Sequence, residues 1–239
     1  MNYASIRTCD IANGEGVRVS LFVSGCTHHC KGCFNPDQWD FGYGQPFDRK
    51  VEDEILAALE PSFISGLTIL GGEPMEPANQ RALVPFLRRI ESFKVKVGSN
   101  RVLLESDRAL LESDRGLLES DRARTGGVET LPDPEKILAD PEKTLADSEK
   151  TLAVPKKTLA DPEKTLAGPK KTLWVYTGCL LEELKDPASR WRTEVTDEFL
   201  SMIDVLVDGP FIEELKDISL QFRGSSNQRI LRLKGGVPA

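Results

Sequence analysis

Three cysteines lie within eight residues of one another and could bind a metal cluster. Cys26, Cys30 and Cys33 directly follow a predicted strand over residues 17–24, in the order CTHHCKGC. Three thiolates in one tight loop can occupy three corners of an iron–sulfur cube, and no fourth cysteine lies close in sequence to complete the set. One iron of such a [4Fe-4S] cluster stays open. The spacing therefore predicts a cluster that binds a ligand rather than one that only carries electrons.

A glycine pair follows a second predicted strand, over residues 67–70. Gly71 and Gly72 let a ligand approach the backbone closely, and Glu73 offers carboxylate oxygens to an ammonium group. An ordinary strand-to-helix turn would explain the glycines taken alone. The cysteine loop after one strand and GGEP after a later one, in that order, are a much more specific signal. We therefore treat the two motifs as parts of one site.

Zinc is the main alternative for the cysteine motif. His28 or His29 could act as the fourth tetrahedral ligand beside three thiolates. A zinc-binding interaction module would not explain the GGEP motif or the alternation of predicted strands and helices. Cys9 and Cys179 stand apart in the sequence and are expected to be ordinary thiols.

The elements that position these motifs alternate between strand and helix. Strands are predicted over residues 17–24, 67–70, 173–177 and 203–207. Asp48 can cap a helix, a second helix is predicted over residues 77–93, and a short one over 180–185. Pro85 is expected to bend or restart the second helix. This order predicts an α/β fold with a parallel sheet and with its chemistry at the carboxyl ends of the strands.

Tandem seven-residue repeats interrupt the pattern, first as LLESDRA and then as variants of DPEKTLA. They lack the apolar spacing of a coiled-coil seam, and their recurrent prolines disfavour a long helix. We therefore predict a flexible insertion over residues 97–170. It separates an N-terminal part of the core at 1–96, which carries both motifs, from a C-terminal part at 171–239. A partner-docking arm is the alternative for the repeats.

Composition limits the partners and the location. The apolar content of 39% over 239 residues is enough to build a core. The net charge of -7 argues against nonspecific binding to nucleic acid or to an anionic membrane. The chain has no run of eighteen apolar residues and no signal-peptide pattern, so we expect a cytoplasmic protein.

The motifs together resemble the radical SAM superfamily and, within it, the activating proteins of anaerobic ribonucleoside-triphosphate reductases. The resemblance rests on DIANGEGVRVSLFVSGC, CKGCFNPDQWDF, ILGGEP, LWVYTG, VLVDGPF and LQFRGSSNQRI, and it covers the chain except the repeats. It implies a partial parallel (β/α) barrel interrupted by the insertion, and it puts GSSNQR near the mouth of the site. Two departures are a glycine, Gly32, where many members carry an aromatic residue, and Gly14-Glu15-Gly16 where such activases commonly read GPG.

The resemblance also implies the cofactors and their contacts. One [4Fe-4S] cluster binds to Cys26, Cys30 and Cys33, and its open iron takes the amino and carboxylate groups of S-adenosyl-L-methionine (SAM). The implied SAM contacts are Gly32, Cys33, Phe34, Gly71, Gly72 and Glu73, of which the last three receive the methionine amino group. No residue is expected to act as a general base.

The implied activity is that of an oxidoreductase that activates a partner enzyme. An external reductant such as flavodoxin supplies one electron, SAM is cleaved to a 5'-deoxyadenosyl radical, and this radical takes hydrogen from a glycine of the large subunit of the reductase. The alternatives are an activase of another glycyl-radical enzyme, a radical SAM enzyme acting on a small molecule, and a chain disabled by its repeats. The short core favours a macromolecular substrate, and the intact motifs argue against a disabled chain.

Overall fold

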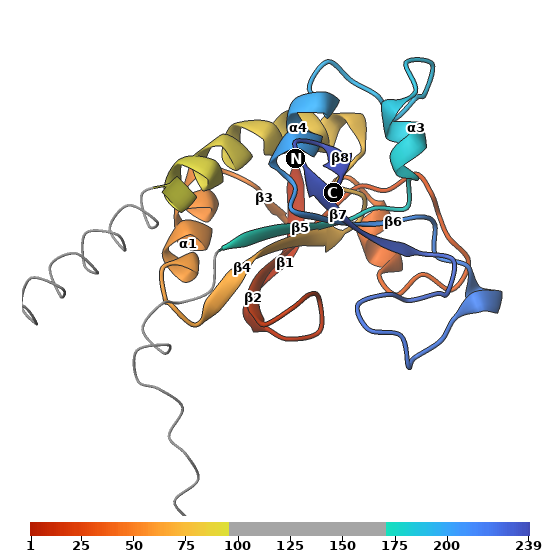
Figure 1. The fold of residues 1–239 in the computed structure, drawn as a ribbon, viewed down its shortest axis with the longest axis horizontal. Helices are drawn as coiled ribbons and strands as arrows, with labels where there is room; N and C mark the ends of the chain where they lie inside the picture. The colour runs from red at the N-terminus through yellow and green to blue at the C-terminus, as the bar shows by residue number, and fades with distance from the viewer. Residues whose placement is uncertain (96–170) are drawn as a thin grey trace, which may run out of the picture. The chain divides into compact units, whose positions relative to one another are not determined.

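The computed structural model describes residues 1–95 and 171–239, which belong to one compact unit (Figure 1). The predicted insertion, both as a flexible segment and as a docking arm, lies outside these residues. The two described segments contribute strands to the same sheet, so the core is built from both sides of the repeats. No helix in the described segments is both long and apolar enough to cross a membrane.

A mixed sheet forms the centre of the described unit. Its strands are β1 (Asn2–Asp10), β2 (Val17–Val23), β3 (Gln45–Pro46), β4 (Ile64–Gly71), β5 (Thr172–Tyr176), β6 (Val205–Asp208), β7 (Arg229–Lys234) and β8 (Val237–Pro238). They are ordered β3-β1-β2-β4-β5-β6-β7-β8. The central strands β2, β4, β5 and β6 are parallel, as the alternating pattern predicts.

The edges of the sheet correct that prediction, because β1 and β3 on one side and β7 and β8 on the other pair antiparallel. The short turn over residues 11–16 returns the chain directly beside β1, and such a connection gives an antiparallel pair. A parallel core with antiparallel edges is consistent with a partial barrel of the radical SAM type.

The helices largely follow the predictions. Helix α1 (Arg49–Leu59) begins after Asp48, whose side chain accepts a hydrogen bond from the Val51 amide. The next helix runs over residues 77–95 and passes through Pro85 without a restart, because the buried side chains around the proline hold the helix against the sheet. Helix α3 (Leu181–Lys185) was predicted, whereas α4 (Thr196–Met202) was not.

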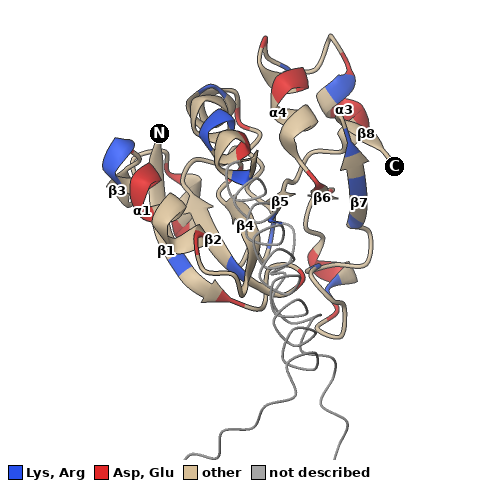
Figure 2. Cartoon of the chain, turned by 60° about the vertical axis from the view of Figure 1, so that its left-hand side comes forward, with Lys and Arg blue, Asp and Glu red and all other residues tan. Residues whose placement is uncertain are grey.

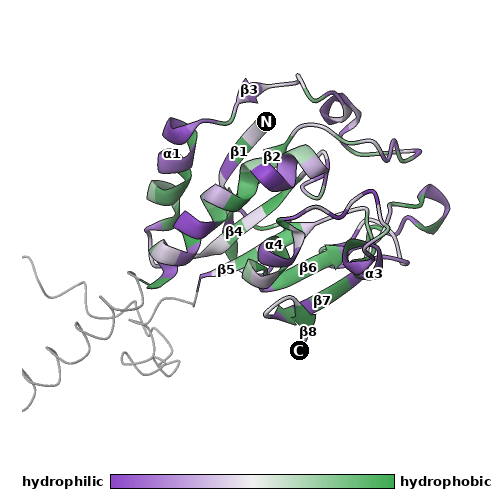
Figure 3. Cartoon of the chain, turned by 90° about the horizontal axis from the view of Figure 1, so that it is seen from above, coloured by the Kyte–Doolittle hydropathy of each residue, from purple (hydrophilic) through white to green (hydrophobic). Residues whose placement is uncertain are grey.

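The two faces of the central sheet differ in composition. Alternate side chains of each strand point to opposite faces. One face carries Val19, Leu21, Ile69 and Val175 and packs in the main core against the helices, which lie on the same side of the sheet in Figure 1. Strands β5 and β6 are correspondingly coloured as hydrophobic in Figure 3. The opposite face carries Arg18, Ser20, Thr68, Trp174 and Tyr176, so it mixes polar side chains with two aromatic ones.

Charged residues of both signs lie on the helices and also on strands such as β1 and β7 (Figure 2), and several ion pairs connect neighbouring elements. Arg81 pairs with Glu194 at 2.8 Å and Arg88 with Glu198 at 2.6 Å, which joins the helix over residues 77–95 to the α4 region. These pairs are exposed, so each contributes little to stability.

Candidate active site

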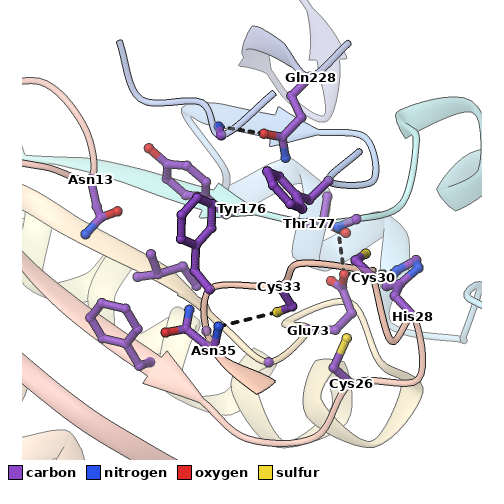
Figure 4. Close-up of a pocket in the computed structure, with 18 of the residues that line it drawn as sticks. Asn13, Cys26, His28, Cys30, Cys33, Asn35, Glu73, Tyr176, Thr177 and Gln228 are labelled. Carbon is purple, nitrogen blue, oxygen red and sulfur yellow. Dashed lines mark hydrogen bonds and ion pairs between the residues drawn. The ribbon is translucent and has the colours of Figure 1, made fainter. Parts of the chain in front are cut away.

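A cavity of about 510 Å³ opens at the carboxyl ends of the central strands. Each loop that follows a parallel strand contributes to its lining: Cys33 after β2, Gly72 after β4, Thr177 after β5 and Gly209 after β6. This is the edge where open α/β sheets bind ligands, and the volume suits a small molecule. Figure 4 shows the lining side chains converging from these loops.

The cysteine loop leaves β2 through a sharp glycine turn. Gly25 has a φ of +94°, and a side chain there would collide with the ring of Phe41. The Gly25 amide donates to Gln38 O at 2.9 Å and the Cys26 amide donates to Trp39 O at 3.1 Å. The short 3-10 helix Pro36–Trp39 therefore fixes the start of the loop.

The three predicted ligand cysteines all line the cavity. Cys26 is buried and Cys30 and Cys33 are partly exposed. Desolvation by burial raises the pKa of Cys26 to about 12, and it also raises the pKa of Cys30. Thiols in such surroundings ionise only when a cation compensates their charge, as a bound metal centre does. The Asn35 amide donates to Cys33 Sγ at 3.4 Å, a contact that suits a thiolate (Figure 4).

The spacing of the thiols fits a cluster better than a single zinc ion. Ligand atoms around one tetrahedral ion lie close together. Within the described residues, the group of three such atoms within 4.8 Å of one another is His28, Glu73 and Cys179, which contains none of the predicted ligand cysteines. The ring of His29 packs against that of Trp39, with centroids 4.6 Å apart and planes tilted by 34°. A cube that offers a separate iron to each thiolate accommodates the wider spacing.

The glycine pair touches the cysteine loop through its backbone. The Gly72 amide donates to Val23 O at 2.8 Å and the Glu73 amide donates to Gly25 O at 2.9 Å. A Cβ on Gly72 would lie 2.7 Å from Gly25 O, so no side chain fits there. Gly71 has a φ of +109°, which favours glycine. The structure thus brings both sequence motifs together, as predicted.

Glu73 lies at the junction of three loops. Its Oε1 accepts a hydrogen bond from the Met75 amide and its Oε2 accepts one from the Gly178 amide, both at 2.8 Å. His28 Nε2 lies 3.2 Å from the same Oε2 and 3.5 Å from Cys179 Sγ. A carboxylate has about four acceptor positions, so Glu73 keeps capacity for one further donor in the cavity that it lines.

Two residues of the helix start, which the sequence analysis missed, hold these loops together. Asn79 is fully buried and donates to Ser24 O at 3.0 Å and to Glu73 O at 2.9 Å. Glu76 Oε1 accepts hydrogen bonds from the amide and the hydroxyl of Thr27, both at 2.7 Å. Polar residues at the start of an amphipathic helix were the available signal, but ordinary helix capping explains them equally well.

The two remaining predicted SAM contacts, Phe34 and Gly32, lie in different surroundings. Phe34 lines the cavity and is 62% exposed, with its ring 5.2 Å from that of Phe211. Gly32 is not among the lining residues; it has a φ of +69° and lies against the side chain of Glu213. Five of the six predicted SAM contacts therefore line the cavity, and Gly32 shapes the loop beside it.

The far wall of the cavity comes from residues that carried no predicted role. Tyr176 and Asn13 line it on the side away from the cysteines (Figure 4). Gln228 also lines it; its Oε1 accepts from the Gly224 amide at 2.8 Å and its Nε2 donates to Gly209 O at 3.1 Å. The GSSNQR segment thus lies at the cavity, as the resemblance implied.

Comparison with known proteins agrees with this geometry. Residues 12–103 and 158–231 match the family described as "4Fe-4S single cluster domain". The anaerobic ribonucleoside-triphosphate reductase-activating protein of Pasteurella multocida is 33% identical over 97% of this chain and 98% of its own length. That of Haemophilus influenzae is 32% identical over 98% and 99%. That of Enterobacteria phage T4 is 45% identical over 35% of this chain and 53% of its own length. The chain therefore belongs to the family of anaerobic ribonucleoside-triphosphate reductase-activating proteins.

Proposed function

We propose that this chain activates an anaerobic ribonucleoside-triphosphate reductase by generating a glycyl radical on it. The observation that carries the proposal is the convergence of three thiols and the GGEP motif on one cavity, in a chain of the activating-protein family. Cys26, Cys30 and Cys33 would hold the [4Fe-4S] cluster. When bound, the cluster and SAM supply a 5'-deoxyadenosyl radical that can take hydrogen from a glycine.

The chain's own residues bind, orient and shield the cofactors. The Gly71-Gly72 backbone lets the methionine end of SAM approach the cysteine loop, and Glu73 has acceptor capacity for its amino group. Cys33 and Phe34 would lie against the same ligand, with Gly32 setting the course of the loop. Phe22, Leu70 and Phe211 make the walls partly apolar, which would limit water around the reacting atoms once the cofactors fill the cavity.

The site needs both described segments of the chain. The cysteine and GGEP motifs come from residues 1–96, and Thr177, Gly209 and Gln228 come from residues 171–239. We therefore propose one catalytic core divided by the insertion at 97–170, acting in the cytoplasm. An external one-electron donor such as flavodoxin would supply the reducing equivalent, because the reaction consumes one electron.

The decisive assay uses the full chain, reconstituted with iron and sulfide without oxygen, reduced and mixed with SAM. We expect 5'-deoxyadenosine and, with the reductase present, the EPR doublet of a glycyl radical. Cys30→Ala should lose both signals, whereas Cys9→Ala is the matched control because Cys9 is exposed and does not line the cavity. Cleavage of SAM with a radical only on another glycyl-radical enzyme would replace the proposed partner. Bound zinc without iron would refute the proposal.

A further inference from the structure

One wall of the cavity is the long connection between β6 and β7. Phe211, Leu220 and Phe222 of this connection line the cavity. The connection is folded back on itself, since the Ser226 amide donates to Leu215 O at 2.9 Å and a β-bridge joins Lys216 to Ser225. Phe211, Leu220 and Phe222 therefore belong to the site, whereas Leu215 and Ile218 of the same connection are exposed to solvent.

The wall is also joined to the cysteine loop. Lys31 Nζ lies 2.9 Å from Glu213 Oε2 and 3.5 Å from Glu214 Oε1. Lys216 Nζ lies 4.9 Å from the centre of the Phe34 ring. The mouth of the cavity on this side is thus framed by two lysines and two glutamates, Lys31, Lys216, Glu213 and Glu214, whose formal charges cancel.

Apolar side chains stand out from this rim. Ile218 is 95% exposed, Phe34 62% and Leu215 42%. Within the described ranges 1–95 and 171–239, Ile218 is almost bare, whereas Lys216 and Phe211 cover part of the Phe34 ring. Exposed apolar side chains grouped beside paired charges have the composition of a protein interface, with an apolar centre and a polar rim. Solvent exposure of these three residues costs free energy that a partner would recover.

We propose that Leu215, Ile218 and the exposed part of Phe34 form the docking surface for the glycine-bearing segment of the reductase. The inference rests on the proposed function. The hydrogen donor is a glycine on a separate polypeptide, so that polypeptide must cross the rim of the cavity to reach the bound SAM. The wall and the apolar surface belong to the same chain segment, so docking on the outer side places the partner directly at the mouth.

The test separates docking from chemistry with two substitutions on the wall. Ile218→Lys and Leu215→Lys put a charge into the apolar surface without changing any lining residue. Binding of the reductase is measured directly on the protein without its cofactors, for example by fluorescence anisotropy. The half-saturating reductase concentration for glycyl-radical formation and the formation of 5'-deoxyadenosine without the reductase are measured on the loaded protein. Phe63→Lys is the matched control, because Phe63 is 60% exposed at the amino end of β4, away from the cavity.

We expect each wall variant to weaken reductase binding about tenfold or more, to raise the half-saturating concentration correspondingly, and to leave partner-free SAM cleavage within about twofold. Phe63→Lys should match the wild type. Unchanged reductase binding in both wall variants would overturn the proposal. So would a loss of partner-free cleavage with normal binding, because the wall would then act on the cavity instead. A wild-type protein that never forms the glycyl radical would instead refute the proposed function.

Discussion

The two ends of the central strands both bury polar groups, but they treat them differently. At the amino end, Arg18 is fully buried, and its guanidinium donates to Thr68 Oγ1 at 2.7 Å and to the carbonyls of Leu67 and Thr172 at 2.7 and 2.8 Å. Lys171 donates to Pro61 O and Ile64 O, both at 2.6 Å. Each charge there is satisfied by the fold itself.

At the carboxyl end, the polar groups face an open cavity. Cys26 and Cys30 have thiol pKa values raised by burial, and the glycine pair leaves room beside them. The two ends therefore differ in whether their buried polar groups have hydrogen-bond partners in the fold, and not in how deeply those groups are buried. Buried cations that donate to oxygens of the fold belong to the sheet's own structure, whereas buried thiols that need a cation indicate a ligand site.

The substitution with the strongest predicted consequence removes a cluster ligand at the carboxyl end and leaves the amino end intact. Cys26→Ala should abolish cluster binding and SAM cleavage, because it removes the most buried thiol of the three ligands. The unfolding free energy of the protein without its cluster should change by less than about 2 kcal/mol, because Ala fills most of the space of a small buried thiol. Iron analysis and urea unfolding check the two parts. A full cluster content in this variant would show that the ligand set is wrong.

A second substitution removes buried hydrogen bonds at the amino end and leaves the carboxyl end intact. Arg18→Met should lower the unfolding free energy by roughly 3 kcal/mol, because several buried acceptors lose their donor. Iron content per folded chain should stay normal. Arg232→Met is the control, since Arg232 is exposed and, within the described residues, forms its ion pair with exposed Glu15. This substitution should cost about 0.5 kcal/mol or less. Loss of the cluster in folded Arg18→Met would contradict the separation of the two ends.

A subtler change tests the contact between the two motifs. Gly72→Ala would place a Cβ 2.7 Å from Gly25 O and force the GGEP loop away from the cysteine loop. We expect SAM binding to weaken about tenfold, roughly 1.4 kcal/mol, as measured by equilibrium binding to the loaded protein. Gly42→Ala is the control, because the nearest atom to its Cβ is the Asp40 side chain at 3.4 Å. Equal SAM affinity in Gly72→Ala would mean that the close approach is unimportant.

A small pH dependence of the unfolding free energy is expected from Lys171 at the amino end. Burial lowers the pKa of Lys171 below its usual 10.5. Between the lowered value and 10.5 the unfolded chain binds a proton that the folded chain has released, so stability from this group rises with pH. The unfolding free energy of the wild type minus that of Lys171→Met should therefore increase as pH approaches 10.5 from below. A difference that stays flat or falls would contradict the burial effect.

Features encoded by a few neighbouring residues could be predicted from the sequence. Cysteine spacing, the glycine pair and the apolar alternation of the parallel strands each lie within a short window. Strand β1 was missed because NYASIRTCD is mostly polar and half-exposed at the side of the sheet, and α4 because TDEFLSM is short. The cavity wall formed by Asn13, Tyr176 and Gln228 brings together residues far apart in the chain, and no spacing rule connects them.

The EPR spectrum of the reduced, reconstituted protein before and after addition of SAM tests whether the three cysteines hold a SAM-binding [4Fe-4S] cluster. A [4Fe-4S] cluster held by Cys26, Cys30 and Cys33, with its fourth iron open, predicts a reduced-cluster signal that changes when SAM binds. We expect this signal in the wild type and in Cys9→Ala, and we expect it to be absent from Cys30→Ala. A signal that SAM leaves unchanged, or one that persists at full intensity in Cys30→Ala, would contradict the account.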